Sequence, residues 1–195
     1  MSEADLAAFI LGGGKSTRMG TDKAFVEFEG RTLLDRALDL ARSVSRDVQI
    51  VGQKEKYSAY APTVEDIFPG CGPLGGIHAA LRASNRDVNL ILAVDVPFVT
   101  EELLRYLIGR AEASAALVTV PRVGHGFQPL CAVYRRGFGD AAERALRQGR
   151  YKIDALFDPA HTQIIREEEL QSAGFSAACF RNLNTPEDLA LAQDP

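Results

Sequence analysis

The sequence is poor in the residues that metal centres and disulfide frameworks require. Its 195 residues include no tryptophan, three histidines and three cysteines. Cys71, Cys131 and Cys179 are widely spaced and form neither a CxxC pair nor a Cys/His cluster, so no zinc-binding spacing is present. We therefore expect reduced thiols and a cytoplasmic protein.

Long apolar runs and an excess of positive charge are also missing. The longest apolar stretches, residues 6–11 and 90–94, have the length of strands and are far too short to cross a membrane. The acidic N-terminus has no basic region, so no secretory signal is predicted. A net charge of −4, from 22 Lys and Arg against 26 Asp and Glu, argues against binding to a nucleic-acid backbone. We expect no membrane partner and no nucleic-acid partner.

What is present is the alternation of strands and helices that an α/β domain shows. Apolar runs predict strands at residues 6–11, 48–51, 63–64, 88–94 and 115–120. Helical periodicity or capping residues predict helices at residues 31–44, 54–60, 77–82 and 100–110. The order implies βαβ units, hence an α/β fold with a mainly parallel sheet and helices on both faces. With no repeat or linker, residues 1–195 are expected to form one domain.

The last third of the chain predicts a small antiparallel element and further helices. Gly124-His125-Gly126 indicates a turn after which residues 130–134 pair with the preceding strand. Residues 138–147 are expected to be helical, with Gly149 ending the helix. Edge strands are predicted at residues 162–165 and 177–180, and a helix is predicted at residues 186–192.

A glycine-rich segment directly follows the first predicted strand. Gly12, Gly13 and Gly14 let backbone N–H groups approach a polyphosphate without interference from Cβ atoms. Three cations follow in the same segment, Lys15, Arg18 and Lys23. This density of positive charge next to a glycine-rich turn favours phosphate binding over an ordinary βα turn.

Other phosphate-binding and catalytic motifs do not fit the sequence. A P-loop would need glycine where Phe9 stands, and a dinucleotide fingerprint would need glycine where Thr17 stands. The serines occupy no GxSxG elbow, and the histidines have no triad or metal-ligand spacing. Nucleophilic hydrolysis is therefore not supported.

Two acidic positions lie at the ends of predicted strands. Asp95 follows a buried strand and precedes Pro97, a position from which a carboxylate can hold Mg²⁺ on a phosphate. The alternative is that Asp95 makes a turn or caps the helix that follows Thr100. Asp66 precedes the glycine-rich residues 70–76 and can accept hydrogen bonds from a base, or it can lie in a plain surface turn.

Residues 11–23, Leu-Gly-Gly-Gly-Lys-Ser-Thr-Arg-Met-Gly-Thr-Asp-Lys, resemble the nucleotidyltransferase loop L-A-G-G-x-S-x-R-M-G-x-D-K. The resemblance continues through Gly-Pro-Leu-Gly-Gly at 72–76, Asp-Val-Pro-Phe at 95–98, Gln-Pro at 128–129 and Asn-Leu-Asn-Thr-Pro-Glu-Asp-Leu at 182–189. The last motif and the short chain are most similar to the molybdenum cofactor guanylyltransferase family. Two positions depart from the pattern: Gly12 replaces Ala, which we expect to be harmless, and Val51-Gly52-Gln53 lacks the Asn often found there.

The resemblance implies a Rossmann-like, three-layer α/β fold. It also implies transfer of GMP from GTP to the terminal phosphate of molybdopterin, with release of pyrophosphate and with Mg²⁺ as the metal. It places the catalytic charges on Lys15, Arg18, Lys23 and Asp95, the last also holding the metal. It implies nucleotide binding by Leu11, Gly12, Gly13, Gly14, Lys23, Asp66 and Asp95. On the molybdopterin side it places Asn182, Asn184 and Arg150, with Lys152 as a further phosphate contact.

Such a reaction needs no strong base, because the attacking phosphate oxygen is already ionised. Positioning and charge neutralisation would carry catalysis, which agrees with the absence of a catalytic His or Ser motif. GTP, molybdopterin and the maturation proteins of molybdoenzymes are the expected partners. The alternatives are cytidylyl transfer to molybdopterin, nucleotidyl transfer to a sugar phosphate, and a non-catalytic nucleotide sensor or pterin carrier.

Overall fold

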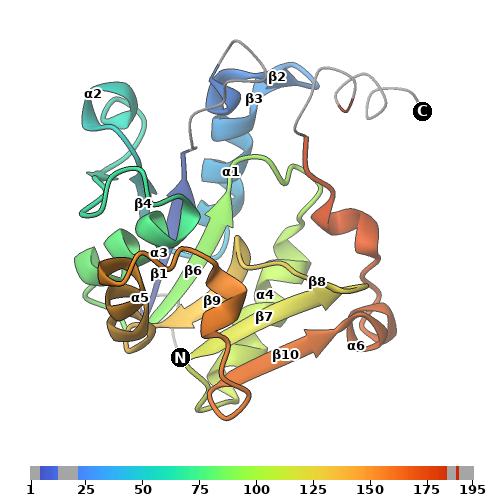
Figure 1. Ribbon diagram of the computed structural model, residues 1–195. Helices are drawn as coiled ribbons and strands as arrows, with labels where there is room; N and C mark the ends of the chain where they lie inside the picture. Colours follow the sequence, from blue (N-terminus) through green and yellow to red (C-terminus); the bar gives the residue numbers. More distant parts are fainter. Residues whose placement is uncertain (1–4, 13–21, 184–187, 189–195) are drawn as a thin grey trace.

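The fold is seen in a computed structural model that describes residues 5–12, 22–183 and 188. Its main sheet has the strand order β10-β7-β9-β6-β1-β4-β5, with β8 paired to β7 (Figure 1). These strands are β1 Leu6–Leu11, β4 Asp47–Val51, β5 Thr63–Val64, β6 Val88–Ala93, β7 Val118–Val123, β8 Gly126–Phe127, β9 Cys131–Arg135 and β10 Thr162–Arg166. A separate antiparallel pair consists of β2 Glu27–Phe28 and β3 Arg31–Thr32.

The α-helices are α1 Leu33–Arg42, α2 Lys54–Tyr57, α3 Pro73–Ala83, α4 Glu101–Glu112, α5 Phe138–Arg147 and α6 Glu167–Ser172. The 3₁₀ helices that the structure describes in full are η2 Lys23–Phe25, η3 Ile153–Leu156 and η4 Ala177–Phe180. Within the described ranges, none of the helices is long and apolar enough to cross a bilayer.

The main sheet is mostly parallel. β1 runs parallel to both of its neighbours, β4 and β6, and β5 continues the parallel order beyond β4. β9 is antiparallel to β6 and to β7, so β6 and β7 share one direction, which β10 follows. The carboxyl ends of β1, β4, β5 and β6 therefore meet at one edge of the sheet. That edge carries α2, β2 and β3 (Figure 1).

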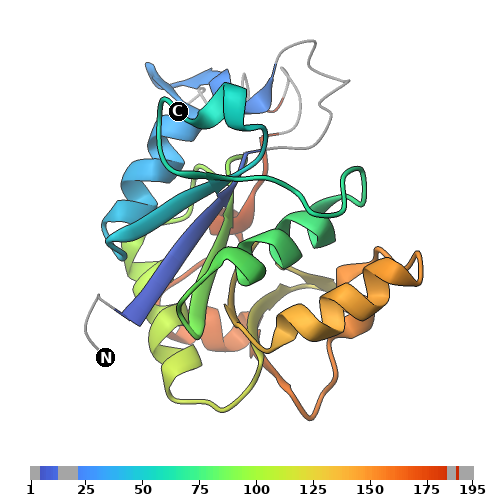
Figure 2. The ribbon, with the colours of Figure 1, turned by 90° about the vertical axis from the view of Figure 1, so that its left-hand side faces the viewer.

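Alternate residues of β1 supply two separate cores. Leu6, Ala8 and Ile10 join a cluster with the apolar faces of α1 and α4. Ala7, Phe9 and Leu11 join a second cluster, which includes the apolar residues of α3 and α5. Figure 2 shows these helix pairs on opposite sides of the sheet. The predicted three-layer α/β architecture is confirmed.

Several predicted elements match the structure closely. The strands expected at residues 6–11 and 63–64 and the helix expected at residues 138–147 have the predicted bounds. Gly149 follows the C-cap of α5 with φ of 69°, a conformation that glycine adopts without strain. The Thr100 side chain accepts a hydrogen bond from the backbone N–H of Leu103, so this threonine is the predicted cap of α4.

Other predictions need correction. Residues 177–180 form the 3₁₀ helix η4 and not an edge strand, because Gly174 turns the chain and Phe175 packs on Tyr106 of α4, 5.5 Å between ring centroids. The helix α3 begins at Pro73, inside the segment expected to be a loop, because Gly72 at φ of 68° ends the loop and proline suits the first helical turn. The helix predicted at 186–192 lies outside the described residues apart from Asp188, which is helical.

Replacing Thr100 with alanine tests the cap of α4. The change removes the side-chain acceptor of the Leu103 N–H, so we expect the free energy of unfolding to fall by about 1 kcal/mol. Urea denaturation measures the loss, and Thr100→Ser, which keeps the hydroxyl, should restore most of it. An alanine variant as stable as the wild type would contradict the assignment.

Candidate nucleotide site

The candidate site lies at the carboxyl edge of the parallel strands. Gly12 follows β1, Gly52 follows β4, Asp66 lies two residues beyond β5, and Asp95 lies two residues beyond β6. Ligands of open parallel sheets bind at this edge because the connecting loops, rather than the buried strands, present polar groups there.

Lys23 and Asp95 form the central ion pair of this edge. The Lys23 Nζ lies 2.7 Å from the Asp95 Oδ2, although 72 residues separate the two positions. Their side chains are only 15% and 18% exposed, so water screens the pair less than it screens a surface pair. Asp22 fixes the backbone beside Lys23, because its carboxylate accepts a hydrogen bond from the Ala24 N–H and caps η2. The structure thus brings together two of the predicted catalytic residues.

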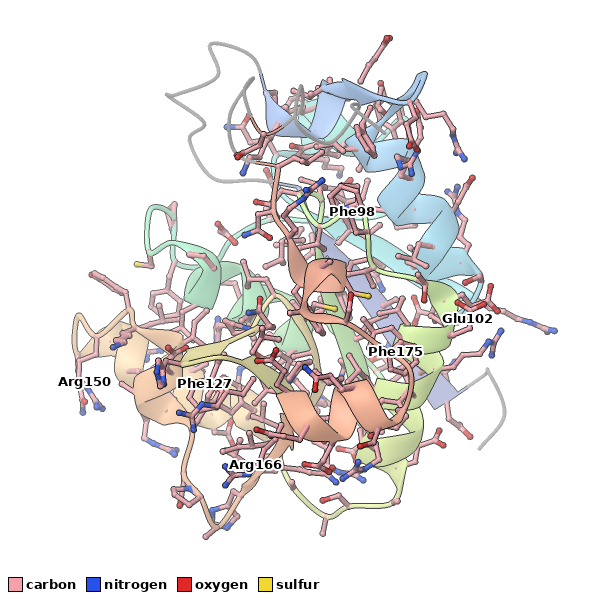
Figure 3. All side chains as sticks on the ribbon, turned by 90° about the vertical axis from the view of Figure 1, so that its right-hand side faces the viewer. Phe98, Glu102, Phe127, Arg150, Arg166 and Phe175 are labelled. Atoms are coloured by element: carbon pink, nitrogen blue, oxygen red, sulfur yellow. The ribbon has the colours of Figure 1, made fainter. Side chains whose placement is uncertain are left out.

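The C-terminal segment adds Asn182 to the same region. The backbone N–H of Leu183 donates to the carbonyl oxygen of Asp95 at 2.9 Å, and the Leu183 side chain is fully buried. Arg181 lies over the ring of Phe98, with its guanidinium carbon 4.4 Å from the ring centroid. Two contacts therefore hold the chain on either side of Asn182 against the segment that carries Asp95. Figure 3 shows Phe98 close to the end of β6 in this region.

Leu11 and Gly12 are bound mainly to the protein itself. The Leu11 side chain packs against α3, where a Cβ added to Gly76 would lie 3.3 Å from the Leu11 Cδ2. The Gly12 N–H donates to the carbonyl of Val51 at 3.0 Å, and its carbonyl accepts a hydrogen bond from the Tyr57 hydroxyl. These two residues fix the position at which the predicted phosphate-binding loop begins. Their contact with a nucleotide stays a prediction, and Gly13, Gly14, Lys15 and Arg18 lie outside the described residues.

Asp66 lies at the same edge but on the far side of β1 and β4 from Asp95. It is an exposed residue, yet the protein atoms around its carboxyl group shield it from water and raise its pKa above the ordinary value. A ligand that reached both carboxylates would have to extend across the ends of two strands, as a nucleotide does between its base and its phosphates.

Arg150 lies apart from the Lys23–Asp95 pair. It follows α5, is exposed, and bonds to the side chain of Gln148 at 2.6 Å and 3.0 Å. Figure 3 shows Arg150 far from Phe98, with its side chain directed outward. The next residue, Tyr151, bonds to the side chain of Cys71, which raises the pKa of the phenol. Arg150 is thus beside the segment that leads into α3, and Asn184 lies outside the described residues.

The chemistry of Asp95 fits Mg²⁺ bound together with a phosphate. Among the described residues no group of three or more His, Cys, Asp or Glu side chains could cage a metal ion. Mg²⁺ often uses one or two carboxylates and takes its remaining ligands from substrate phosphates and water. A single shielded carboxylate beside a lysine suits that mode of binding.

The sequence patterns do not predict the contacts of three residues, Lys56 and Tyr57 at this edge and Tyr151 beside Arg150. Tyr57 bonds to Gly12, Lys56 pairs with Asp22, and Tyr151 bonds to Cys71. None of these contacts follows from residue spacing, since each joins separate elements. Gly12, where the resembled pattern has Ala, is the one departure in the sequence at these contacts, and it does not indicate Tyr57 as the partner.

The described chain is an α/β protein with a mostly parallel sheet and a Lys–Asp pair at the ends of its strands. Residues 8–164 match the MobA-like NTP transferase domain, and the chain belongs to this family of nucleotidyltransferases. The molybdenum cofactor guanylyltransferase of Desulfosudis oleivorans is 36% identical over 191 residues, covering 96% of this chain and 94% of the relative. A probable molybdenum cofactor guanylyltransferase of Pelotomaculum thermopropionicum is also 36% identical, covering 94% of this chain and 90% of the relative.

The solved structures include a similar fold over the same length. Molybdopterin-guanine dinucleotide biosynthesis protein A from Archaeoglobus fulgidus superposes with a TM-score of 0.83 and is 30% identical, covering 97% of each chain. The family membership predicted from the loop at residues 11–23 is confirmed.

Thiol labelling tests the placement of the glycine-rich residues 70–76, which include Cys71. Cys131 is buried, and burial raises the pKa of its thiol to about 12, so almost no thiolate forms near neutral pH. Cys71 is half-buried in the loop before α3. With a maleimide at about pH 8, peptide mapping should find Cys71 modified in the folded protein and Cys131 only after denaturation. Equal rates at the two thiols would contradict this placement.

Proposed function

We propose that this protein transfers GMP from GTP to the terminal phosphate of molybdopterin and releases pyrophosphate. The observation that carries the proposal is the shielded Lys23–Asp95 pair at the carboxyl edge, in a chain that belongs to the MobA-like NTP transferase family. Relatives over nearly the whole chain are named molybdenum cofactor guanylyltransferases, which supports guanylyl transfer within this family.

The reaction forms one P–O bond and breaks another. An ionised oxygen of the acceptor phosphate attacks the α-phosphorus of GTP, and the bond between the α-phosphorus and the bridging oxygen breaks, so pyrophosphate leaves. No proton has to be removed from the acceptor. The Lys23 ammonium would stabilise the negative charge that develops on the transferred and leaving phosphates. We propose that Lys15 and Arg18 contribute further positive charge.

The histidines of the chain agree with a reaction without a general base. His78 is buried between α3 and α5, and burial lowers its pKa, so it is neutral near neutral pH. His161 lies at the amino end of β10, on the side of the sheet opposite the carboxyl ends of β1, β4 and β6. It pairs with Asp158 at 3.0 Å. His125 is exposed in the turn between β7 and β8.

We propose that Asp95 holds Mg²⁺ when the nucleotide is bound, with the phosphates supplying further oxygen ligands. The cation supplies Lewis-acid stabilisation of phosphoryl oxygens. Asp66 would accept hydrogen bonds from the imino and amino groups of guanine. Asn182, Asn184 and Arg150, with Lys152, would bind the molybdopterin side. We also propose that the protein is cytoplasmic and that it passes its product to maturation proteins of molybdoenzymes.

Pyrophosphate release tests the reaction and the base together. We expect the purified protein with Mg²⁺ to release pyrophosphate from GTP only when molybdopterin is present, and to do so far faster than from CTP. Release from CTP instead would show cytidylyl transfer, and release with a sugar phosphate would show a different acceptor. Binding of GTP without release under any condition would favour a sensor or a pterin carrier.

Replacing Asp95 with asparagine tests the role of its charge. The amide keeps the shape of the side chain but not the anion, so we expect kcat/KM to fall on the order of 100-fold. Asp87→Asn is a matched control, because Asp87 lies at the other end of β6 and pairs with Arg135. Wild-type activity in the Asp95 variant, measured as pyrophosphate release, would contradict the proposed role.

A further inference from the structure

The short helix α2 packs against the ends of β1 and β4. It has four residues, too few to be stable alone in water, so contacts with the rest of the protein hold it in place. Tyr57, its last residue, is 3% exposed. A Cβ added to Gly12 would lie 2.7 Å from the Tyr57 Cζ, and one added to Gly52 would lie 2.6 Å from the Cε2. The ring therefore occupies the space that both glycines leave.

Tyr57 also holds the backbone where the predicted phosphate-binding loop begins. Its hydroxyl donates a hydrogen bond to the carbonyl oxygen of Gly12, whose N–H donates to Val51. Burial raises the pKa of the Tyr57 phenol to about 12, so the hydroxyl remains a donor throughout the neutral and mildly alkaline range. Both backbone groups of Gly12 are thus fixed by the protein.

The preceding residue, Lys56, holds the other end of the same loop. Its ammonium pairs with the carboxylate of Asp22, the residue before Lys23. The ammonium lies 5.8 Å from the centroid of the Phe25 ring and 5.1 Å from that of the Tyr57 ring. The two rings stack on each other, with centroids 6.1 Å apart and planes inclined by 23°. The helices α2 and η2 are therefore joined by a charge pair and by aromatic contact.

We propose that Lys56 and Tyr57 are positioning residues that set the affinity for the nucleotide. Adjacent in sequence, they hold the two ends of the loop, Tyr57 at Gly12 and Lys56 at Asp22, and Asp22 precedes the lysine that pairs with Asp95. Groups that the protein already holds in place lose less conformational freedom when they bind a ligand. The inference rests on the proposed function, because it assumes that the backbone at Gly12 and the ammonium of Lys23 contact the phosphates of GTP.

The experiment removes the Tyr57–Gly12 contact and the Lys56–Asp22 contact one at a time. It measures GTP binding by calorimetry and turnover by pyrophosphate release. Tyr57→Phe keeps the ring but loses the bond to Gly12, and Lys56→Gln loses the pair with Asp22. Each should weaken GTP binding about tenfold, while kcat at saturating GTP stays within about threefold. If the two residues had a merely structural role, each substitution would lower the melting temperature. It would not weaken GTP binding while leaving kcat nearly unchanged. Tyr60→Phe, a change in the neighbouring exposed tyrosine, is the matched control.

A double-mutant cycle tests the contact between Gly12 and Tyr57. Gly12→Ala restores the alanine of the resembled pattern but places its Cβ against the ring, so it should weaken GTP binding by more than about tenfold. In a Tyr57→Leu background the ring is gone, and the same substitution should weaken binding by less than about threefold. Equal effects in the two backgrounds would overturn the inferred coupling.

The outcomes separate the two proposals. If the wild type binds GTP and releases pyrophosphate, but Tyr57→Phe and Lys56→Gln bind GTP as the wild type does, the positioning role is overturned and the proposed function stands. If the wild type neither binds GTP nor releases pyrophosphate from any nucleotide, both proposals are overturned. Weaker binding in both variants, with kcat and the Tyr60→Phe control unchanged, supports the inference.

Discussion

The burial of β1 is the constraint on which the rest of the structure depends. All six of its residues are buried, and parallel neighbours cover both of its edges. Helices cover both of its faces, so the strand has no exposed backbone or side chain to offer a ligand. Polar contacts must therefore come from the residues after its carboxyl end, beginning at Gly12. Because β4 and β6 end at the same edge, segments far apart in the sequence meet there.

In the proposed function, the Lys23–Asp95 pair would link the binding of anions to the binding of cations at that edge. In the described structure the two opposite charges neutralise each other, and both side chains are largely removed from water. A phosphate that approaches Lys23 also approaches the Asp95 carboxylate, which repels it. A divalent cation on Asp95 would turn this repulsion into attraction, since it would carry positive charge to the phosphate. Under the proposed function, the pair would favour a nucleotide that arrives with its metal over either one alone.

The sequence predicts best those features that depend on neighbouring residues. The apolar run of β1, the periodicity of α5 and the positive φ at Gly149 are local, and the structure has all three as expected. The Ala-Ala-Cys-Phe segment at 177–180 resembles a strand, but tertiary packing of Phe175 on α4 decides its conformation. Asp95 can be identified from its position after a strand, whereas its pairing with Lys23 joins positions 72 residues apart and is not predicted by any residue spacing. Tyr57 had no signal, because its contacts join three separate segments.

Side-chain packing, and not the backbone freedom that a glycine-rich motif suggests, explains why positions 12 and 52 are glycine. Neither adopts the left-handed conformation that requires glycine, so backbone freedom does not explain them. What both share is the Tyr57 ring, which would collide with a Cβ at either position. Gly12 in place of the pattern's Ala is therefore more than a permissive substitution, since the ring fills the space that a methyl group would occupy. An alanine at position 12 would therefore require the Tyr57 ring to move, and with it the hydrogen bond from the Tyr57 hydroxyl to the carbonyl of residue 12.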